Sequence, residues 1–206
     1  RKSRPGRLDD PQALEWLAGL QQACSPPLTA NRTLGALGSM VASRIARAFR
    51  FGGPSFVVSA GEASGMRALE IGVRALQAGE LDAVLAGAVD LCGELRRIAA
   101  EQAVRPCSAT GAVRPFDRSA DGTLPGEGAV AVVLKRLDQA LADGDRVYAV
   151  VRGIGAASGG GIDAGTPAIE VYRCALDRAA QEAGIGPAPI GFFEAHGSAI
   201  PAEDKL

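Results

Sequence analysis

The sequence is poor in the residues that most metal and nucleic-acid sites use. It has one histidine and four cysteines in 206 residues, and Cys24, Cys92, Cys107 and Cys174 form no CxxC pair. These are too few for a Cys/His zinc site, and they are typical of free thiols in a reducing cytosol. Aromatic residues make up only 4% and the formal net charge is −1. Neither a base-stacking platform nor a basic nucleic-acid surface is therefore expected.

Long apolar runs are also absent. No stretch reaches the roughly 18 apolar residues that a membrane-spanning helix needs. The basic start, RKSRPGRLDD, is not followed by the apolar segment of a secretory signal. We therefore expect a cytoplasmic protein without a membrane span. The composition, 47% hydrophobic and 22% charged, is that of a globular domain.

Strand-like and helical patterns alternate and predict an α/β fold with a mainly parallel or mixed sheet and buried helices. An N-terminal arm and helix are expected in residues 1–30, with Asp10 as the cap, Pro11 as the first helical residue and Ser25-Pro26-Pro27 as the stop. The other predicted helices cover residues 34–48, 62–78, 137–142 and 167–183. The predicted strands cover residues 56–58, 83–89, 129–134, 147–152 and 190–195, and residues 92–128 are expected to be mostly loops.

Buried surfaces follow from the same patterns. The strands at 83–89 and 129–134 are apolar on both faces and should be buried. The last helix should be capped by Thr166 and closed by Gly184. Its predicted buried face consists of Ile169, Tyr172, Leu176, Ala179 and Ala183.

Glycines mark the middle of the chain. Gly65 and Gly72 would each weaken an isolated helix by roughly 1 kcal/mol, so they indicate very close packing by another backbone. Gly79 is a plausible helix stop. The six glycines between residues 153 and 165 predict a flexible connection. They do not match GxGxxG because residue 158 is serine, so no dinucleotide site is expected.

Two groups of charged residues have a structural and a functional interpretation. Asp117, Asp121 and Glu127 lie among glycines, but their spacing does not fit a calcium loop. We expect them to hold loops by accepting backbone N–H bonds, and no metal site is predicted. Three arginines, at 44, 47 and 50, cluster near a helix C-terminus. They either compensate the helix dipole or form a basic lip for a phosphorylated carrier.

Three segments resemble the β-ketoacyl synthase family, which has the thiolase fold. GPSFVVSAGEASG is similar to the family's GPS-x-TVDTACSS block, and RPFDRSADGTLPGEGAVAVVLKRL to its PFD-x-x-ADG-x-x-x-GEGAG-x-VLKRL block. EAHGSAIPAED is similar to EAHGTGT-x-x-GD. The three follow one another in family order and implicate residues 31–206 as the central part of a ketosynthase-like domain, incomplete at both ends. The variants look closest to synthase modules of polyunsaturated fatty acid and iterative polyketide pathways.

The resemblance places Glu62 where a condensing enzyme has its nucleophilic cysteine. A condensing enzyme holds its acyl chain as a thioester, and a helix N-terminus favours the required thiolate. A carboxylate would form a mixed anhydride, which water destroys. Glu62 therefore argues against carbon–carbon bond formation at this site. Its structural explanation is that glutamate in a first helical turn stabilises the helix by ~0.3–1 kcal/mol.

Three functions remain open within the resemblance. Some subunits that lack the cysteine serve as chain-length factors and form dimers with a true ketosynthase. Others decarboxylate malonyl thioesters, for which His196 matches the histidine that stabilises the enolate oxyanion. His196 could instead be only a hydrogen-bonded residue at a strand end. A third possibility is a truncated element that only holds a synthase together.

The resemblance also implies partners. A ketosynthase subunit or domain would pair through the strand at Phe56–Ser59, and an acyl carrier protein would deliver substrates on its phosphopantetheine. The chain itself is expected to hold no cofactor. Ser198 keeps the hydroxyl of the family threonine, whereas Ile200 loses one, which places the pantetheine contacts there in doubt. The family's second histidine and its lysine would lie beyond residue 206.

Overall fold

The computed structural model describes residues 11–24, 29–159, 168–186 and 190–205. The chain divides into two compact units, residues 1–57 and residues 58–206. The predicted boundary near residue 30 marks the start of the ketosynthase-like domain, which the division into compact units does not test, and it stays a prediction. No helix in the described ranges is long and apolar enough to cross a membrane.

Helices make up the regular structure of the first unit: α1 (Pro11–Cys24), α2 (Ala30–Ala36) and α3 (Met40–Phe49). The start of α1 at Pro11 is confirmed, while the Asp10 cap and the Ser25-Pro26-Pro27 stop lie outside the described residues. The single helix predicted over 34–48 is wrong. Leu37 is extended and separates α2 from α3, and the glycines on either side of this break are weak helix formers.

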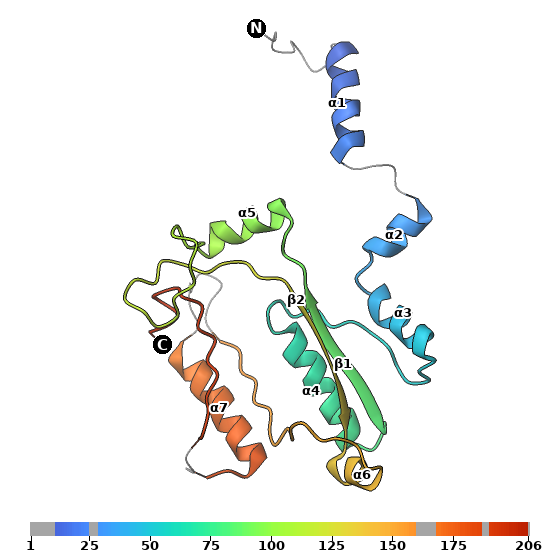
Figure 1. Cartoon of the computed structure of the whole chain (residues 1–206), viewed down its shortest axis with the longest axis vertical. Coiled ribbons are helices and arrows are strands. Elements are labelled where there is room, and N and C mark those ends of the chain that lie inside the picture. Colours follow the sequence, from blue (N-terminus) through green and yellow to red (C-terminus); the bar gives the residue numbers. More distant parts are fainter. Residues whose placement is uncertain (1–10, 25–28, 160–167, 187–189, 206) are drawn as a thin grey trace. The chain divides into compact units, whose positions relative to one another are not determined.

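The second unit is built around α4 (Ser64–Gln77), which packs against β1 (Ala83–Asp90) and β2 (Gly128–Lys135) (Figure 1). The helix glycines face this sheet. A Cβ atom on Gly65 would lie 2.9 Å from Ala88 Cβ, and one on Gly72 would lie 3.0 Å from Val84 Cγ1. The close approach inferred from Gly65 and Gly72 is confirmed, although the neighbours are strand side chains. Gly79 has a φ of 71° just after the helix, as a stop requires.

The sheet differs from the predicted one. β1 and β2 are both confirmed as strands, but they pair antiparallel, from Ala83 opposite Lys135 to Asp90 opposite Gly128. The parallel pairing expected from the alternation of elements is not formed within the described ranges. The predicted burial of both faces is also wrong for both strands, since Val89 of β1 is 58% exposed and Val133 of β2 is 70% exposed. The face that carries Val133 points away from α4, so nothing in the described part of this unit covers it.

Three predicted strands, residues 56–58, 147–152 and 190–195, do not join this sheet. Their β-branched and aromatic residues favour an extended backbone, but a strand also needs a hydrogen-bonded neighbour. No such neighbour lies beside them in the described part of the chain. The mixture of helices and sheet is nevertheless that of the predicted α/β class.

The remaining helices are α5 (Leu95–Val104), α6 (Leu137–Ala142) and α7 (Ile169–Ala183). The sequence predicts α6 and α7, and Gly184 closes α7 in the left-handed conformation (φ 63°). It does not predict α5, which lies in a region expected to be loops. The predicted buried face of α7 is mostly wrong, because only Ala183 is buried while Ile169, Tyr172 and Leu176 are exposed. Thr166 and Pro167 lie outside the described residues.

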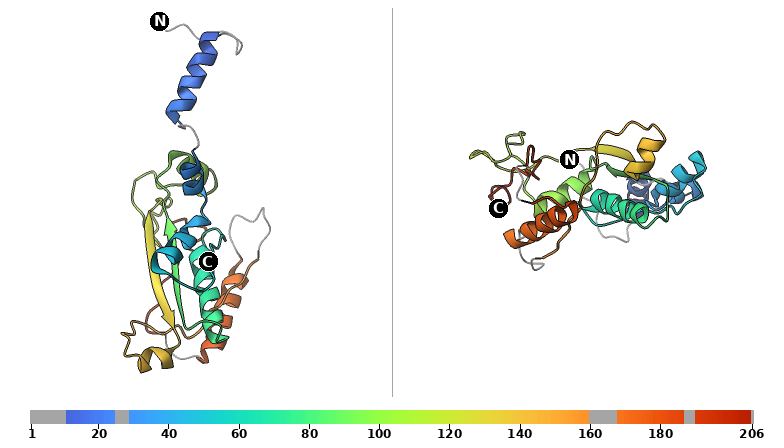
Figure 2. Two further views of the ribbon diagram at one scale, coloured as in Figure 1. Left: turned by 90° about the vertical axis from the view of Figure 1, so that its right-hand side faces the viewer. Right: turned by 90° about the horizontal axis from the view of Figure 1, so that it is seen from below.

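The glycine-rich segment after residue 152 packs on α7. A Cβ atom on Gly153 or Gly155 would overlap backbone atoms of Ala179 or Ala175. For residues 153–159, the prediction of a flexible connection is therefore wrong: these glycines permit close contact with a helix. Glycines 160, 161 and 165 lie outside the described residues. Figure 2 shows α4 between the two strands and α7 within this unit.

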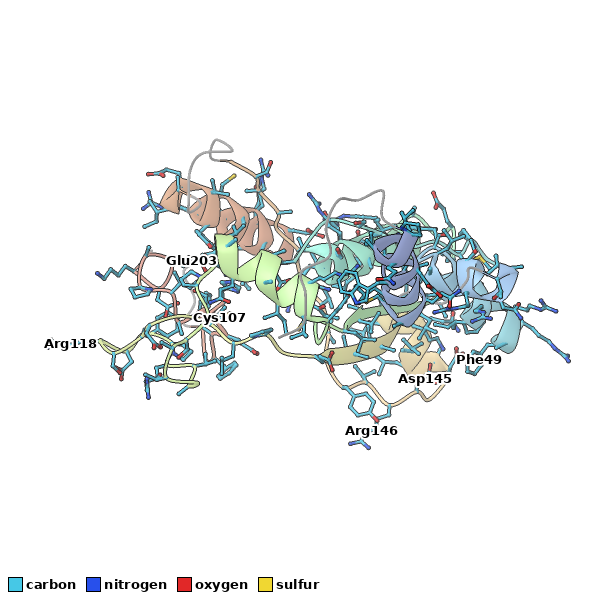
Figure 3. The ribbon with its side chains drawn as sticks, turned by 90° about the horizontal axis from the view of Figure 1, so that it is seen from above. Phe49, Cys107, Arg118, Asp145, Arg146 and Glu203 are labelled. Atoms are coloured by element: carbon cyan, nitrogen blue, oxygen red, sulfur yellow. The ribbon has the colours of Figure 1, made fainter. Side chains whose placement is uncertain are left out.

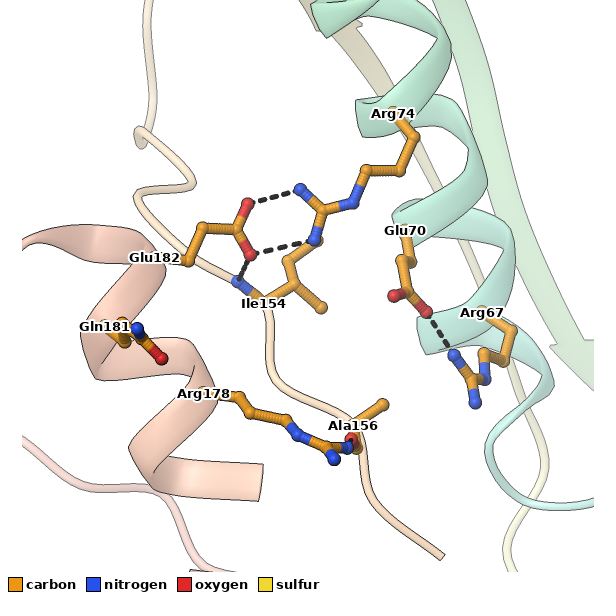
Figure 4. Close-up of a pocket in the computed structure, with 8 residues that line it drawn as sticks. All are labelled: Arg67, Glu70, Arg74, Ile154, Ala156, Arg178, Gln181 and Glu182. Atoms are coloured by element: carbon orange, nitrogen blue, oxygen red, sulfur yellow. Dashed lines mark hydrogen bonds and ion pairs between the residues drawn. The ribbon is translucent and has the colours of Figure 1, made fainter. Parts of the chain in front are cut away.

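A cavity of about 510 Å³ lies between α4, α7 and this segment (Figure 4). Arg67 pairs with Glu70 and Arg74 with Glu182, while Arg178 donates to the Ala156 carbonyl. Arg74 donates to both carboxylate oxygens of Glu182, and the Ile154 N–H donates to Glu182 Oε2 over 3.1 Å. The hydrogen bonds from Arg74 and Ile154 lower the pKa of Glu182 to about 2. This carboxylate thus ties α4, α7 and the glycine-rich segment together.

Acid should weaken this link. A carboxylate whose pKa is lower in the folded than in the unfolded state stabilises the fold above its unfolded pKa, and this stabilisation is lost as the pH falls towards the folded pKa. We expect Glu182→Gln to lower the urea midpoint at pH 7 and to lower it much less near pH 2. Urea unfolding of the full chain at several pH values measures this.

The matched control is Asp177→Asn, on the exposed surface in the middle of the same helix. It should leave the pH dependence of the midpoint nearly unchanged. Equal effects of the two substitutions at every pH would contradict the assignment.

Candidate functional site

Glu62 lies in the turn that leads into α4. Gly61 adopts a positive φ of 58°, and the backbone between Ala60 and Ser64 is closed by local hydrogen bonds. Ser64 Oγ accepts from the Ala60 N–H over 2.9 Å and donates to the Gly61 carbonyl over 2.6 Å. Glu62 lies just before the N-terminus of α4, which begins two residues later, so it is not in the first helical turn as its structural explanation assumed. Its side chain is 73% exposed.

Arg105 joins Glu62 to two groups from the end of the chain. It follows α5, and its own N–H donates to the Glu101 carbonyl over 2.7 Å. Its Nη1 donates to Glu62 Oε1. Its Nη2 lies 2.7 Å from Glu203 Oε2 and 3.0 Å from His196 Nε2. Both site residues predicted from the sequence, Glu62 and His196, therefore contact the same guanidinium, that of Arg105.

We call Arg105, Glu62, His196 and Glu203 the Arg105 cluster. Burial of Arg105 disfavours its charged form, but the hydrogen bond to Glu203 and the charges of Glu62 and Glu203 outweigh this and raise its pKa. Burial likewise acts to raise the pKa of Glu203, whereas hydrogen bonds from Ser198 and Arg105 prevail and lower it. The Glu203 side chain is only 14% exposed. Arg105 Nε is buried and has no hydrogen-bond partner among the described residues.

A loop cluster, residues 106–127 and 196–205, supports this site (Figure 3). Asp204 accepts from the Phe116 N–H over 2.8 Å, and the Gly122 N–H donates to the Ala199 carbonyl over 3.1 Å. A Cβ atom on Gly122 would overlap the backbone of residues 106–108, so only glycine fits there. In Figure 3 Cys107 and Glu203 lie within this cluster, and Arg118 extends from its edge.

The three carboxylates predicted to hold loops do so. Asp117 accepts from the Ser119 N–H over 2.7 Å, and Asp121 from the Thr110 N–H over 3.2 Å. Glu127 accepts from the Gly93 N–H over 2.7 Å. Hydrogen bonds from the Ser119 and Ser108 hydroxyls lower the pKa of Asp117 and Asp121 respectively. Within the described ranges, no three His, Cys, Asp or Glu side chains are grouped to hold a metal ion.

Residues 198–200, shortly after His196, are buried, whereas His196 itself is half exposed. Gly197 has a positive φ of 54°, and a Cβ atom there would lie 3.1 Å from Pro115 Cβ. Ser198, Ala199 and Ile200 are buried, and the Ile200 N–H donates to Ser198 Oγ over 3.2 Å. The hydroxyl retained at Ser198 thus serves the turn itself. His196, by contrast, is half exposed beside Arg105.

Sequence reasoning missed Arg105 and Glu203. Arg105 lies in a region expected to be loops, and it matches none of the three resembling segments. Glu203 belongs to the third segment, but nothing in its spacing relates it to residue 105. The contact between them spans 98 positions. The only sequence signal for Arg105 was an arginine in a region expected to be a loop. Such a signal is weak, because an arginine in a loop is usually solvated.

Comparison with known proteins identifies the family of the chain. Residues 13–140 match the family model "Beta-ketoacyl synthase, N-terminal domain", and residues 148–206 match "Beta-ketoacyl synthase, C-terminal domain". The chain is 42% identical, over 174 residues, to the phthioceranic/hydroxyphthioceranic acid synthase of Mycobacterium tuberculosis. This match covers 84% of the chain but only 8% of that synthase. The chain belongs to the β-ketoacyl synthase family.

Solved structures show the same fold. An oxazolomycin ketosynthase domain from Streptomyces albus superposes with a TM-score of 0.77 at 30% identity, covering 91% of this chain and 33% of that one. A type II polyketide ketosynthase in complex with its acyl-carrier protein gives a TM-score of 0.75 at 23% identity, covering 85% and 45%. The thiolase-like fold is therefore confirmed. The resemblance to polyunsaturated fatty acid synthases stays a prediction.

Arg105 should matter more to stability than a surface arginine. Arg105→Met removes the partner of the nearly buried Glu203, and losing a charged hydrogen-bond partner costs about 1.5–3 kcal/mol. Arg97→Met is the matched control on α5, where the arginine pairs with Asp90 and Glu101 at the surface. Exposed pairs contribute about 0–1 kcal/mol. Chemical unfolding of the full chain measures both, and a cost for Arg97→Met equal to that for Arg105→Met would contradict this ranking.

Proposed function

We propose that this chain is part of a ketosynthase-like domain that does not condense, and that it acts as a chain-length-factor-type partner of a condensing ketosynthase in a polyketide or fatty acid synthase. The supporting observation is the ion pair of Glu62 with Arg105 at the start of α4. In a condensing enzyme the corresponding turn presents a thiolate. Here it presents a carboxylate that is already engaged by a guanidinium.

The chemistry of the Arg105 cluster favours this proposal. A carboxylate that attacked a thioester would give an anhydride, which cannot store an acyl chain in water. The cluster holds two carboxylates and one guanidinium, and therefore has a net charge of −1 when His196 is neutral. The carboxylate of a malonyl group would be repelled, by on the order of 1–4 kcal/mol for an unscreened charge at 4 Å. The decarboxylase alternative with a protonated Glu62 would also give up the ion pair with Arg105.

The proposed partners are a ketosynthase subunit or domain and an acyl carrier protein. Arg44 and Arg47 lie three residues apart on α3, and Arg50 is its C-cap. A row of cations of this kind suits an acidic carrier surface. One structural relative is a ketosynthase solved with its acyl-carrier protein. The substrate would remain on the carrier's phosphopantetheine, and this chain would supply no cofactor.

The absence of acyl transfer to Glu62 is directly testable. The full synthase polypeptide is incubated with acyl carrier protein charged with a labelled acyl group, and the peptide containing residue 62 is analysed by mass spectrometry. We expect no adduct in the natural protein. Glu62→Cys should gain an acyl adduct, because Arg105 and the start of α4 both favour a thiolate there.

Glu62→Ala controls for the loss of the carboxylate and should carry no adduct. A stable acyl adduct on Glu62 of the natural protein would overturn the proposal. The proposal would also be overturned if a synthase that has no other ketosynthase-like domain still formed carbon–carbon bonds.

Carrier docking should depend on the α3 arginines. Replacing Arg44, Arg47 and Arg50 by alanine removes three exposed charges, each contributing about 0.2–1 kcal/mol to ion pairing. We expect the carrier to bind about tenfold more weakly, with less dependence on salt. Titration calorimetry at low and high salt measures both. Arg173→Ala, on α7, is the control and should bind normally; an unchanged affinity in the triple variant would exclude this docking surface.

A further inference from the structure

The hydrogen bond between Arg105 and His196 constrains the imidazole. Arg105 Nη2 lies 3.0 Å from His196 Nε2. A guanidinium has only N–H donors and cannot accept a hydrogen bond. Nε2 must therefore be the acceptor, and a neutral imidazole that accepts at Nε2 carries its proton on Nδ1.

The other contacts of Arg105 fix this assignment. Its Nη1 is directed to Glu62, while the two hydrogens of Nη2 have two acceptors, Glu203 Oε2 at 2.7 Å and His196 Nε2. A proton on Nε2 would point at a hydrogen of Nη2. Glu203 offers that proton no alternative, because its Oε2 lies 3.7 Å from Nε2, beyond hydrogen-bond distance.

We infer that Arg105 is a positioning residue that holds His196 in the Nδ1–H tautomer, so that Nε2 cannot donate a hydrogen bond to an oxyanion. Arg105 itself needs no contact with a substrate for this effect. It acts through the histidine and, with Glu62 on its other nitrogen, engages both groups of the predicted site. The buried Nε–H of Arg105 lacks a described partner, so the side-chain contacts that orient the guanidinium are those of Nη1 and Nη2.

The inference deepens the proposed function, and its meaning for catalysis rests on that proposal. Decarboxylation of a malonyl thioester leaves an enolate whose oxygen must be stabilised by N–H donors. The Nε2 atom of His196 is already used as an acceptor. The Arg105 cluster therefore contains no thiol that could carry an acyl chain. The ring nitrogen of His196 next to Arg105 also carries no N–H that could stabilise an enolate.

Nuclear magnetic resonance can determine the tautomer without assignment, since the chain has one histidine. A long-range ¹H–¹⁵N spectrum of the labelled full chain at pH 8 distinguishes protonated from unprotonated ring nitrogens. We expect an unprotonated Nε2 and a protonated Nδ1. In Arg105→Met the Nε2–H form should become the major one, and Arg105→Lys, which also offers only donors, should restore the Nδ1–H form at least in part.

Glu62→Gln is the matched control, because it changes the same cluster but keeps Arg105, and it should retain the natural spectrum. A protonated Nε2 in the natural chain would overturn the inference, and this measurement does not depend on whether any variant folds. An unchanged tautomer in a folded Arg105→Met chain would overturn it as well. The acyl-adduct experiment reports on Glu62 alone, so a failure of the proposed function and a failure of this inference give different results.

Discussion

The guanidinium of Arg105 is the contact on which the candidate site depends. It joins the turn before α4, the end of α5 and the last loop of the described chain, which are far apart in sequence. Removing it would leave the carboxylates of Glu62 and Glu203 without the positive charge that they share, and like-charge repulsion would then be uncompensated. The cluster therefore explains how a glutamate is held in this turn, which we propose corresponds to the turn that carries the nucleophile in condensing members of the family. It also makes the local charge negative, which is unsuited to an anionic substrate.

Close helix packing is the second constraint. Gly65 and Gly72 let α4 approach β1 and β2, and Gly153 and Gly155 let the following segment approach α7. Glu182 then connects these parts through Arg74 and Ile154. These contacts hold α4 from both sides and so fix the turn that carries Glu62. The opposite face of the sheet, with Leu85, Val89 and Val133, is exposed, and exposed apolar surfaces of this kind usually mark contacts with other protein.

Much of the regular structure in both units could be predicted from local patterns. The starts or ends of α1, α4, α6 and α7 follow from proline, glycine and helical periodicity, and the strands β1 and β2 from their apolar runs. The loop-holding roles of Asp117, Asp121 and Glu127 also follow from short-range chemistry. The prediction failed for α5, for the break between α2 and α3, and for the pairing direction of the strands. The pairing direction depends on neighbours that the local sequence does not contain, whereas the break coincides with two nearby glycines whose weak helix propensity was not weighed.

The sequence by itself determined the family and the placement of Glu62 in the turn before a helix, because the order of the motifs and the residues of a turn can be read from consecutive positions. It also indicated His196 as the second site residue. Only the tertiary structure decided what these two groups do to each other. Arg105 and Glu203 lie 98 positions apart, and whether an imidazole nitrogen donates or accepts depends on the partner that the fold places against it.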